Sequence, residues 1–241
     1  MESVMLCAVG VGGATAIGAL AGFIFRDAAR RHSSNILAVA AGVMLAAAAT
    51  NLIAPAVESR ELSALLMAVA GLFVGAVVIH SSERLLPIEA CDNESLRSAL
   101  IFAIAMAIHN LPEGVAAGLS FGTGEIGDAL MVTVGIALHN IPEGMIAIFP
   151  LLASGIRPAK AFLLALSGGV AEVIGTVIGY IGAEIAEPVM PFALAFAGGT
   201  MIYVVAGEMI PESQTRGRRR AAFGLILGYA LMTVLNAAIS R

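Results

Sequence analysis

Two copies of a six-residue motif hold the side chains of this sequence that are best suited to bind a metal ion. The motif reads HNLPEG at residues 109–114 and HNIPEG at residues 139–144, thirty positions later. Residues four apart lie on one face of an α-helix, so each copy presents an imidazole and a carboxylate to one point. Imidazole nitrogen with carboxylate oxygen suits Zn²⁺, Fe²⁺, Mn²⁺ or Ni²⁺, whereas Ca²⁺ and Mg²⁺ prefer oxygen alone.

The helices that carry these motifs must be interrupted and buried in a membrane. The proline before each glutamate lacks an N–H group, so it releases the carbonyl four residues earlier and bends the helix. Each copy lies within an apolar stretch long enough to cross a membrane, where ionisable groups are costly and mark functional sites. A pair of kinked helices tied by hydrogen bonds would explain one histidine, but not four ionisable groups repeated at one spacing.

Glu172 supplies a third carboxylate, in the apolar stretch that follows the second motif. By residue count Glu113, Glu143 and Glu172 all fall near the middle of the membrane, and we find no Lys or Arg deep enough to pair with them. A low-dielectric environment favours the neutral form of a carboxylate. Protonation and metal binding therefore both stay open, and the two states could alternate as a cation is taken up and released.

The composition indicates an all-α integral membrane protein with one domain, residues 1–241. Of its residues 59% are hydrophobic and 12% are charged, against roughly 25% charged in soluble domains. A membrane-spanning helix needs about 20 apolar residues, and on that basis the chain divides into eight spans joined by short links. The predicted spans are about 4–25, 35–57, 62–80, 98–122, 127–153, 159–182, 188–210 and 220–240.

The basic residues predict the orientation, because Lys and Arg near span ends favour the cytoplasmic side. Eight spans place both termini and the links 58–61, 123–126 and 183–187 on one side, which carries only Arg60 and Arg241. The opposite side carries eleven: Arg26, Arg30, Arg31, Arg84, Arg97, Arg157, Lys160, Arg216, Arg218, Arg219 and Arg220. We therefore expect a multi-pass protein of the plasma (inner) membrane with both termini extracytoplasmic.

The paired motifs on consecutive spans, followed by a glutamate on the next, resemble the ZIP family of divalent-metal transporters, bacterial type. The eight spans match the topology of that family over the whole chain. The resemblance implies a bundle in which the first three and last three spans form inverted halves around the two motif helices. It also implies no cofactor, but two bound metal ions per protomer. The transported metal would be held by His109, Glu113, His139 and Glu143, and a second metal by Asn110, Glu113, Asn140, Glu143 and Glu172.

The resemblance further places an entrance and an exit. Met44, Asn51 and Glu58 recur at a spacing of seven along one helix face, as a ladder that leads outward from the centre. Met201 matches a position that faces this ladder in the family, although simple packing explains the methionines equally well. Glu208 falls where family members handle metal near the exit.

We expect transport of a divalent transition metal toward the cytoplasm, Zn²⁺ first and Fe²⁺, Mn²⁺ or Cd²⁺ next. An intramembrane metal-dependent hydrolase is disfavoured because Asn follows each motif histidine, where HExxH proteases carry the Glu that acts as general base. A metal-sensing membrane protein without transport stays open. The expected partners are divalent metal ions and the lipid bilayer, without nucleic acid; a homodimer stays open.

Overall fold

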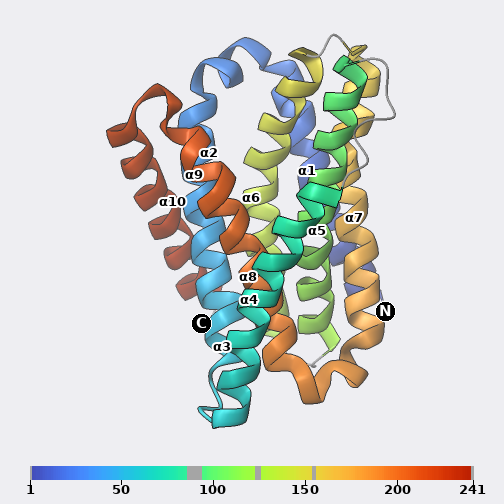
Figure 1. Cartoon of the computed structure of the whole chain (residues 1–241), viewed down its shortest axis with the longest axis vertical. Helices are drawn as coiled ribbons and strands as arrows, with labels where there is room; N and C mark the ends of the chain where they lie inside the picture. The colour runs from blue at the N-terminus through green and yellow to red at the C-terminus, as the bar shows by residue number, and fades with distance from the viewer. Residues whose placement is uncertain (1, 86–93, 123–125, 154–155, 240–241) are drawn as a thin grey trace.

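The computed structural model describes residues 2–85, 94–122, 126–153 and 156–239, and the regular elements of this part of the chain are helices. Within these residues, eight long helices run alongside one another (Figure 1). They are α1 (Glu2–Ile24), α2 (Arg26–Ala47), α4 (Leu62–Leu85), α5 (Glu94–Gly122), α6 (Ile126–Ala153), α7 (Pro158–Ala186), α8 (Met190–Val204) and α10 (Arg218–Ile239). The starts of α2, α7 and α10 lie at one end of the bundle, and the starts of α4, α6 and α8 lie at the other (Figure 1).

Seven segments of the described residues are long and apolar enough to cross a membrane. They are Val4–Ile24, Arg31–Ala56, Leu62–Ser81, Ala129–Phe149, Pro158–Ala183, Met190–Arg216 and Arg218–Ala238. The expected all-helical membrane protein is confirmed, and each segment overlaps one predicted span. The remaining predicted span, 98–122, lies within α5, so the count of eight stays a prediction.

Two spans contain short π-helical segments, each followed by a proline. α2 continues through π-helical Ala48–Ile53 into α3 (Ala54–Ala56), which contains Pro55. α8 continues through π-helical Val205–Met209 into α9 (Ile210–Ser213), which contains Pro211, and then into 3₁₀-helical Gln214–Arg216. The missing N–H group of a proline accounts for the local change in hydrogen bonding. By contrast, α5 and α6 remain α-helical through the motif prolines, so the expectation that these helices are interrupted there is wrong.

One predicted link is wrong. Residues 26–34, which we expected to form a polar connection, are the first turns of α2, and Phe25 alone separates them from α1. The segment has no Gly or Pro, and its Ala and Arg residues are good helix formers, so nothing in it ends a helix. The link before α10 does turn sharply, at Gly217, whose φ of 145° suits glycine.

Glycines bring four helices into backbone contact, and we call α1, α5, α6 and α7 the motif block. A Cβ atom added to Gly114 or Gly118 of α5 would collide with a backbone carbonyl of α7. A Cβ atom added to Gly18 or Gly22 of α1 would collide with a backbone carbonyl of α6 in the same way. Small residues four apart are typical of membrane helices that pack closely, so these contacts join the helices of the motif block into one unit.

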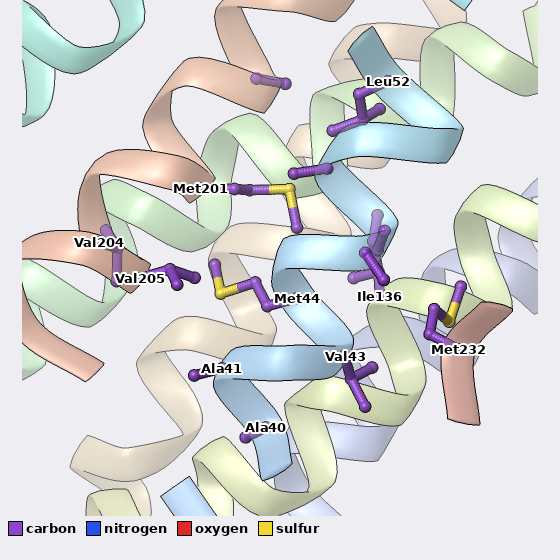
Figure 2. Close-up of a cluster of buried hydrophobic side chains, with 14 of the residues drawn as sticks. Ala40, Ala41, Val43, Met44, Leu52, Ile136, Met201, Val204, Val205 and Met232 are labelled. Atoms are coloured by element: carbon purple, nitrogen blue, oxygen red, sulfur yellow. The ribbon is translucent and has the colours of Figure 1, made fainter. Parts of the chain in front are cut away.

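The other long helices form a second unit, the flanking block, made of α2, α4, α8 and α10 with the short segments that extend them. Gly42 and Gly228 bring α2 against α10, while Gly71 and Gly75 bring α4 against α8, again at backbone carbonyls. Between the blocks, α2 packs against α6 and α5 packs against α8. Figure 2 shows side chains filling part of this boundary, among them Met44, Met201 and Ile136.

Corresponding positions in the two halves of the chain lie 157 residues apart. Residues 12–22 read GGATAIGALAG and residues 169–179 read GVAEVIGTVIG, with glycine at the first, seventh and eleventh positions of both. The contacts correspond as well. Gly18 and Gly22 pack on the carbonyls of residues 141 and 145, and Gly175 and Gly179 pack on those of residues 111 and 115, thirty positions earlier. The same offset relates the start of the π-helical segment at residue 48 to that at residue 205.

Candidate metal centre

The two motif helices exchange their histidines and glutamates. His109 Nε2 lies 2.7 Å from Glu143 Oε1, and His139 Nε2 lies 2.8 Å from Glu113 Oε2. Within one helix, His139 Nε2 is 4.0 Å from Glu143 Oε2. The sequence had suggested pairs within each helix, but the shortest contacts run between α5 and α6. His109, Glu113 and His139 are buried, and the Glu143 side chain is 12% exposed.

The ring of His139 is held from its other side. Its Nδ1 atom lies 3.2 Å from the carbonyl oxygen of Gly135, one turn earlier on α6. A carbonyl can only accept, so Nδ1 carries the proton in this contact and Nε2 faces Glu113. Metal-binding histidines are commonly oriented in this way, with one ring nitrogen donating to a backbone carbonyl and the other facing the metal.

Glu172 lies at the centre of a second hydrogen-bond cluster. Its Oε1 atom accepts from Asn110 Nδ2 at 2.8 Å and from Asn140 Nδ2 at 2.7 Å. Its Oε2 atom accepts from Thr15 Oγ1 of α1 at 3.2 Å. Asn140 Nδ2 also lies 3.4 Å from the carbonyl oxygen of Val11. The cluster therefore joins α1, α5, α6 and α7, which are the four helices of the motif block.

Several buried oxygens of these residues have no hydrogen-bond donor among the described residues. They are Asn110 Oδ1, Glu113 Oε1, Asn140 Oδ1 and Glu143 Oε2. A buried acceptor that is left unpaired costs roughly 1–3 kcal/mol, so four of them in one small region need a partner. A cation is such a partner, because carboxylate and amide oxygens are metal ligands.

The side chains of the two motifs form two His–Glu pairs and do not surround a common point. Within the described residues, no group of three or more His, Cys, Asp or Glu side chains has the geometry to hold a metal ion. The ligand atoms instead form the His–Glu contacts described above. Metal binding would thus require the side chains of His109, Glu113, His139 and Glu143 to exchange these hydrogen bonds for a common centre.

Two of the predicted entrance residues line a cavity of about 290 Å³. The cavity is formed by Thr50, Asn51, Pro55, Glu58, Ser120, Met131, Val132, Met190 and Leu194. Asn51 is held in place there, since its Oδ1 atom accepts from Thr50 and Asn236, and its Nδ2 atom donates to the Met131 carbonyl of α6. Glu58 is exposed.

The other predicted pathway residues lie outside the lining of this cavity. Met44 and Met201 are each 1% exposed and pack between α2 and α8 (Figure 2), outside the lining of the cavity. Glu208 is exposed in the π-helical segment after α8, and its carboxylate is close enough to act electrostatically on His109. Asn51 and Glu208 are themselves 157 positions apart, one in each π-helical segment.

Sequence reasoning missed Thr15, Gly135 and Asn236. A carbonyl partner such as that of Gly135 leaves no trace in a sequence. Thr15 did leave one, because it is the only hydroxyl-bearing residue in the predicted span 4–25. The internal repeat at residues 12–22 and 169–179 carried the same information, since it aligns Thr15 with Glu172.

Comparison with known proteins identifies the family. The model of the ZIP zinc transporter family matches residues 88–236. Zinc transporter GufA of Myxococcus xanthus is 33% identical over 239 residues, which cover 93% of this chain and 94% of that protein. Zinc transporter ZupT of Chlorobaculum parvum is 34% identical, with 92% of each chain covered. Zinc transporter ZIP11 of Xenopus tropicalis is 30% identical, with 93% of each covered. On these matches, this chain belongs to the ZIP zinc transporter family.

Proposed function

We propose that this protein carries Zn²⁺ across the plasma (inner) membrane toward the cytoplasm through the site between α5 and α6. The observation that carries the proposal is the pair of exchanged His–Glu contacts, at 2.7 and 2.8 Å, within two helices of the bundle. Imidazole and carboxylate together suit Zn²⁺, and also Fe²⁺, Mn²⁺ and Cd²⁺ as weaker candidates. The names of the relatives favour zinc.

The transported ion would be held by His109, Glu113, His139 and Glu143. A second ion would lie on the other side of the two glutamates, with Asn110, Asn140 and Glu172. The four unpaired oxygens support this division, since each glutamate uses one oxygen for a histidine and leaves the other without a donor among the described residues. Two metal ions per protomer would bind, bridged by Glu113 and Glu143.

We infer eight spans with both termini extracytoplasmic. The basic residues support this orientation, because eleven of the thirteen belong to one side in the eight-span scheme. We further infer that the first three and last three spans are inverted halves around α5 and α6. The correspondence of contacts at an offset of 157 residues supports this symmetry.

The mechanism that fits best is movement of the motif block past the flanking block. Glycines place backbones in contact throughout the motif block and within the pairs α2–α10 and α4–α8, so these helices would move together. At the boundary, Gly135 faces side-chain atoms of Ala47, Asn51 and Met232. Contacts made by flexible side chains can be exchanged more easily than backbone contacts, and sites between repeats in transporters commonly use such motion. The alternative mechanism is a slow selective channel, in which the blocks would stay fixed.

A hydrolase and a metal sensor are the two other candidate functions. A hydrolase is set aside because ZIP proteins are transporters. A metal sensor without transport would keep the site but would need no route to it. The 290 Å³ cavity beside Asn51 and Glu58 supports a route, and so favours transport.

The test is metal flux into sealed proteoliposomes that contain the purified protein and an internal Zn²⁺ indicator. We expect saturable uptake, with Fe²⁺, Mn²⁺ and Cd²⁺ competing to different degrees, and no uptake of Ca²⁺ or Mg²⁺. Protein-free vesicles provide the control. Tight Zn²⁺ binding without flux would identify a sensor and overturn the proposal.

A further inference from the structure

Thr15 is a buried hydroxyl that no recognised motif includes. Its residue is 0% exposed, and its Oγ1 atom donates to Glu172 Oε2. The glycine that ends the second motif makes this approach possible, because a Cβ atom on Gly144 would collide with the backbone carbonyl of Thr15. Gly114, which ends the first motif, faces the backbone carbonyl of Glu172 in the same way. The two motif glycines thus admit Thr15 and Glu172 to matching positions.

The sequence repeat supports this correspondence. Thr15 and Glu172 are 157 residues apart, the offset that also relates Gly12 to Gly169 and Gly18 to Gly175. Thr15 therefore occupies in α1 the place that Glu172 occupies in α7. Where one half supplies a carboxylate, the other half supplies a hydroxyl that donates to this carboxylate.

The contacts of Glu172 determine which way two amides point. In the ionised form that would bind a metal, Glu172 only accepts hydrogen bonds, so Asn110 and Asn140 then both face it with their NH₂ groups. Their Oδ1 atoms are then turned away and have no donor among the described residues. If the side-chain amide of either asparagine were rotated by 180°, it would fill almost the same space but would direct its NH₂ group toward the metal position.

We propose that Thr15 is a positioning residue of the second metal position, which it serves by holding Glu172 so that both asparagines present oxygen to the metal. The inference rests on the proposed function, since it presupposes a second metal ion. It concerns α1, a helix that contributes no ligand to either metal in the assignment above. The hydroxyl contributes a hydrogen bond to a charged group, which is the stronger class of hydrogen bond.

The experiment is a Zn²⁺ titration of the purified full-length protein, with bound metal counted at equilibrium. In Thr15→Val the second Zn²⁺ should bind roughly ten-fold or more weakly, because the hydrogen bond to a carboxylate is lost. Thr15→Ser keeps the hydroxyl and should stay within about three-fold of the wild type. Thr176→Val is the matched control, because its buried hydroxyl donates only to the Glu172 backbone carbonyl of its own helix, at 2.8 Å.

A second measurement separates positioning from packing. In Thr15→Val, Zn²⁺ binding at the transport site should stay within about three-fold of the wild type, because the Thr15 hydroxyl donates to Glu172, which is not assigned to that site. A packing defect would weaken both metal positions. Thr15→Ala, which adds no bulk, replaces Thr15→Val if the latter does not fold.

Each contrary result has a distinct meaning. A wild-type count of one Zn²⁺ would overturn the two-metal assignment and this inference with it. A wild-type count of two, unchanged in Thr15→Val, would overturn the inference alone. Equal losses in Thr15→Ser or Thr176→Val would also overturn it, because they would reveal a general packing effect.

Discussion

Each exchanged His–Glu contact holds a proton between a nitrogen and an oxygen, and that proton has to leave before the nitrogen can bind a metal. His109 shares one with Glu143, and His139 shares one with Glu113. Ligands of transition metals bind in their deprotonated form, so metal binding and proton release are linked. In the proposed site, protons and Zn²⁺ would therefore compete for the same four side chains.

We expect Zn²⁺ binding to release about two protons per ion at the transport site, one from each His–Glu contact. Uptake should fall as the pH drops through the usual range of histidine, around pH 6.5. Calorimetry in buffers of different ionisation enthalpy gives the proton count. Binding that stayed constant between about pH 5 and 7.5, without proton release, would contradict this reading.

At this scale the sequence predicted which residue types gather, but not how they pair. The spacing of four placed His and Glu on one helix face, and the duplication placed two such faces on consecutive spans. Whether His109 would reach Glu113 or Glu143 depends on the distance and rotation between α5 and α6. Those quantities arise from glycine contacts with α1 and α7, far away in the sequence.

At the scale of the helices, close packing through glycine fixes the separation of neighbours within a block. Gly179 of α7 lies against the Val115 carbonyl, whereas Gly182, three residues later, has no atom within 4 Å of an added Cβ among the described residues. Only the first therefore matters for the contact between α5 and α7.

Gly179→Ala should lower the free energy of unfolding by about 1–3 kcal/mol, because a Cβ atom there forces two backbones apart. Gly182→Ala is the matched control and should be neutral or stabilising by up to about 1 kcal/mol, since alanine favours the helix. Thermal unfolding of the two variants in detergent makes the comparison. Equal stability would show that α5 and α7 are not held by backbone contact.

Asn236 of α10 is expected to tune the entrance, because it donates to both Thr50 and Asn51 beside the cavity. Asn236→Leu should raise the Zn²⁺ concentration for half-maximal uptake by roughly three- to ten-fold, the worth of one hydrogen bond. Thr233→Val is the control, since that hydroxyl bonds only within α10, to the Tyr229 carbonyl. Zn²⁺ uptake by proteoliposomes, measured over a range of Zn²⁺ concentrations, checks this prediction. An unchanged half-maximal concentration in Asn236→Leu would show that the hydrogen bonds of Asn236 to Thr50 and Asn51 do not influence metal entry.

Helix positions were predictable because long apolar runs bounded by polar links leave few alternatives. The π-helical segments were not predictable, although Pro55 and Pro211 mark both of them. A proline can bend a helix, widen one turn or leave it intact, and the outcome depends on neighbouring side chains. The motif prolines illustrate this, because α5 remains helical through Pro112.

For the whole molecule, the distribution of basic residues predicts which end faces the cytoplasm. Arg60, in the turn before α4, should be extracytoplasmic, and Arg157, before α7, should be cytoplasmic. Single cysteines at these positions, with Cys7 and Cys91 replaced by Ala, can be labelled with an impermeant maleimide in intact cells. We expect labelling of Arg60→Cys in intact cells, and of Arg157→Cys only after permeabilisation. The reverse pattern would invert the orientation.

The relation between the halves of the chain was only partly predictable. The motif repeat at thirty residues is obvious, whereas the repeat at 157 residues rests on three glycines, an alanine and an isoleucine in eleven positions. Its meaning becomes clear only when Gly18 and Gly175 are found against equivalent carbonyls of α6 and α5. Short glycine patterns occur by chance in membrane helices, so three-dimensional contacts were needed to recognise this one.

The central claim is that metal crosses the membrane through the site shared by α5 and α6. The most direct test is initial Zn²⁺ uptake at sub-saturating metal by proteoliposomes that contain Glu113→Ala or Glu143→Ala, with Thr133→Val of α6 as control. Thr133 is buried and donates only to the Ala129 carbonyl of its own helix. We predict that both glutamate variants fold and insert but lose nearly all uptake, and lose more than His109→Ala or His139→Ala, since each glutamate would touch both metals. Normal uptake by either glutamate variant would contradict the account.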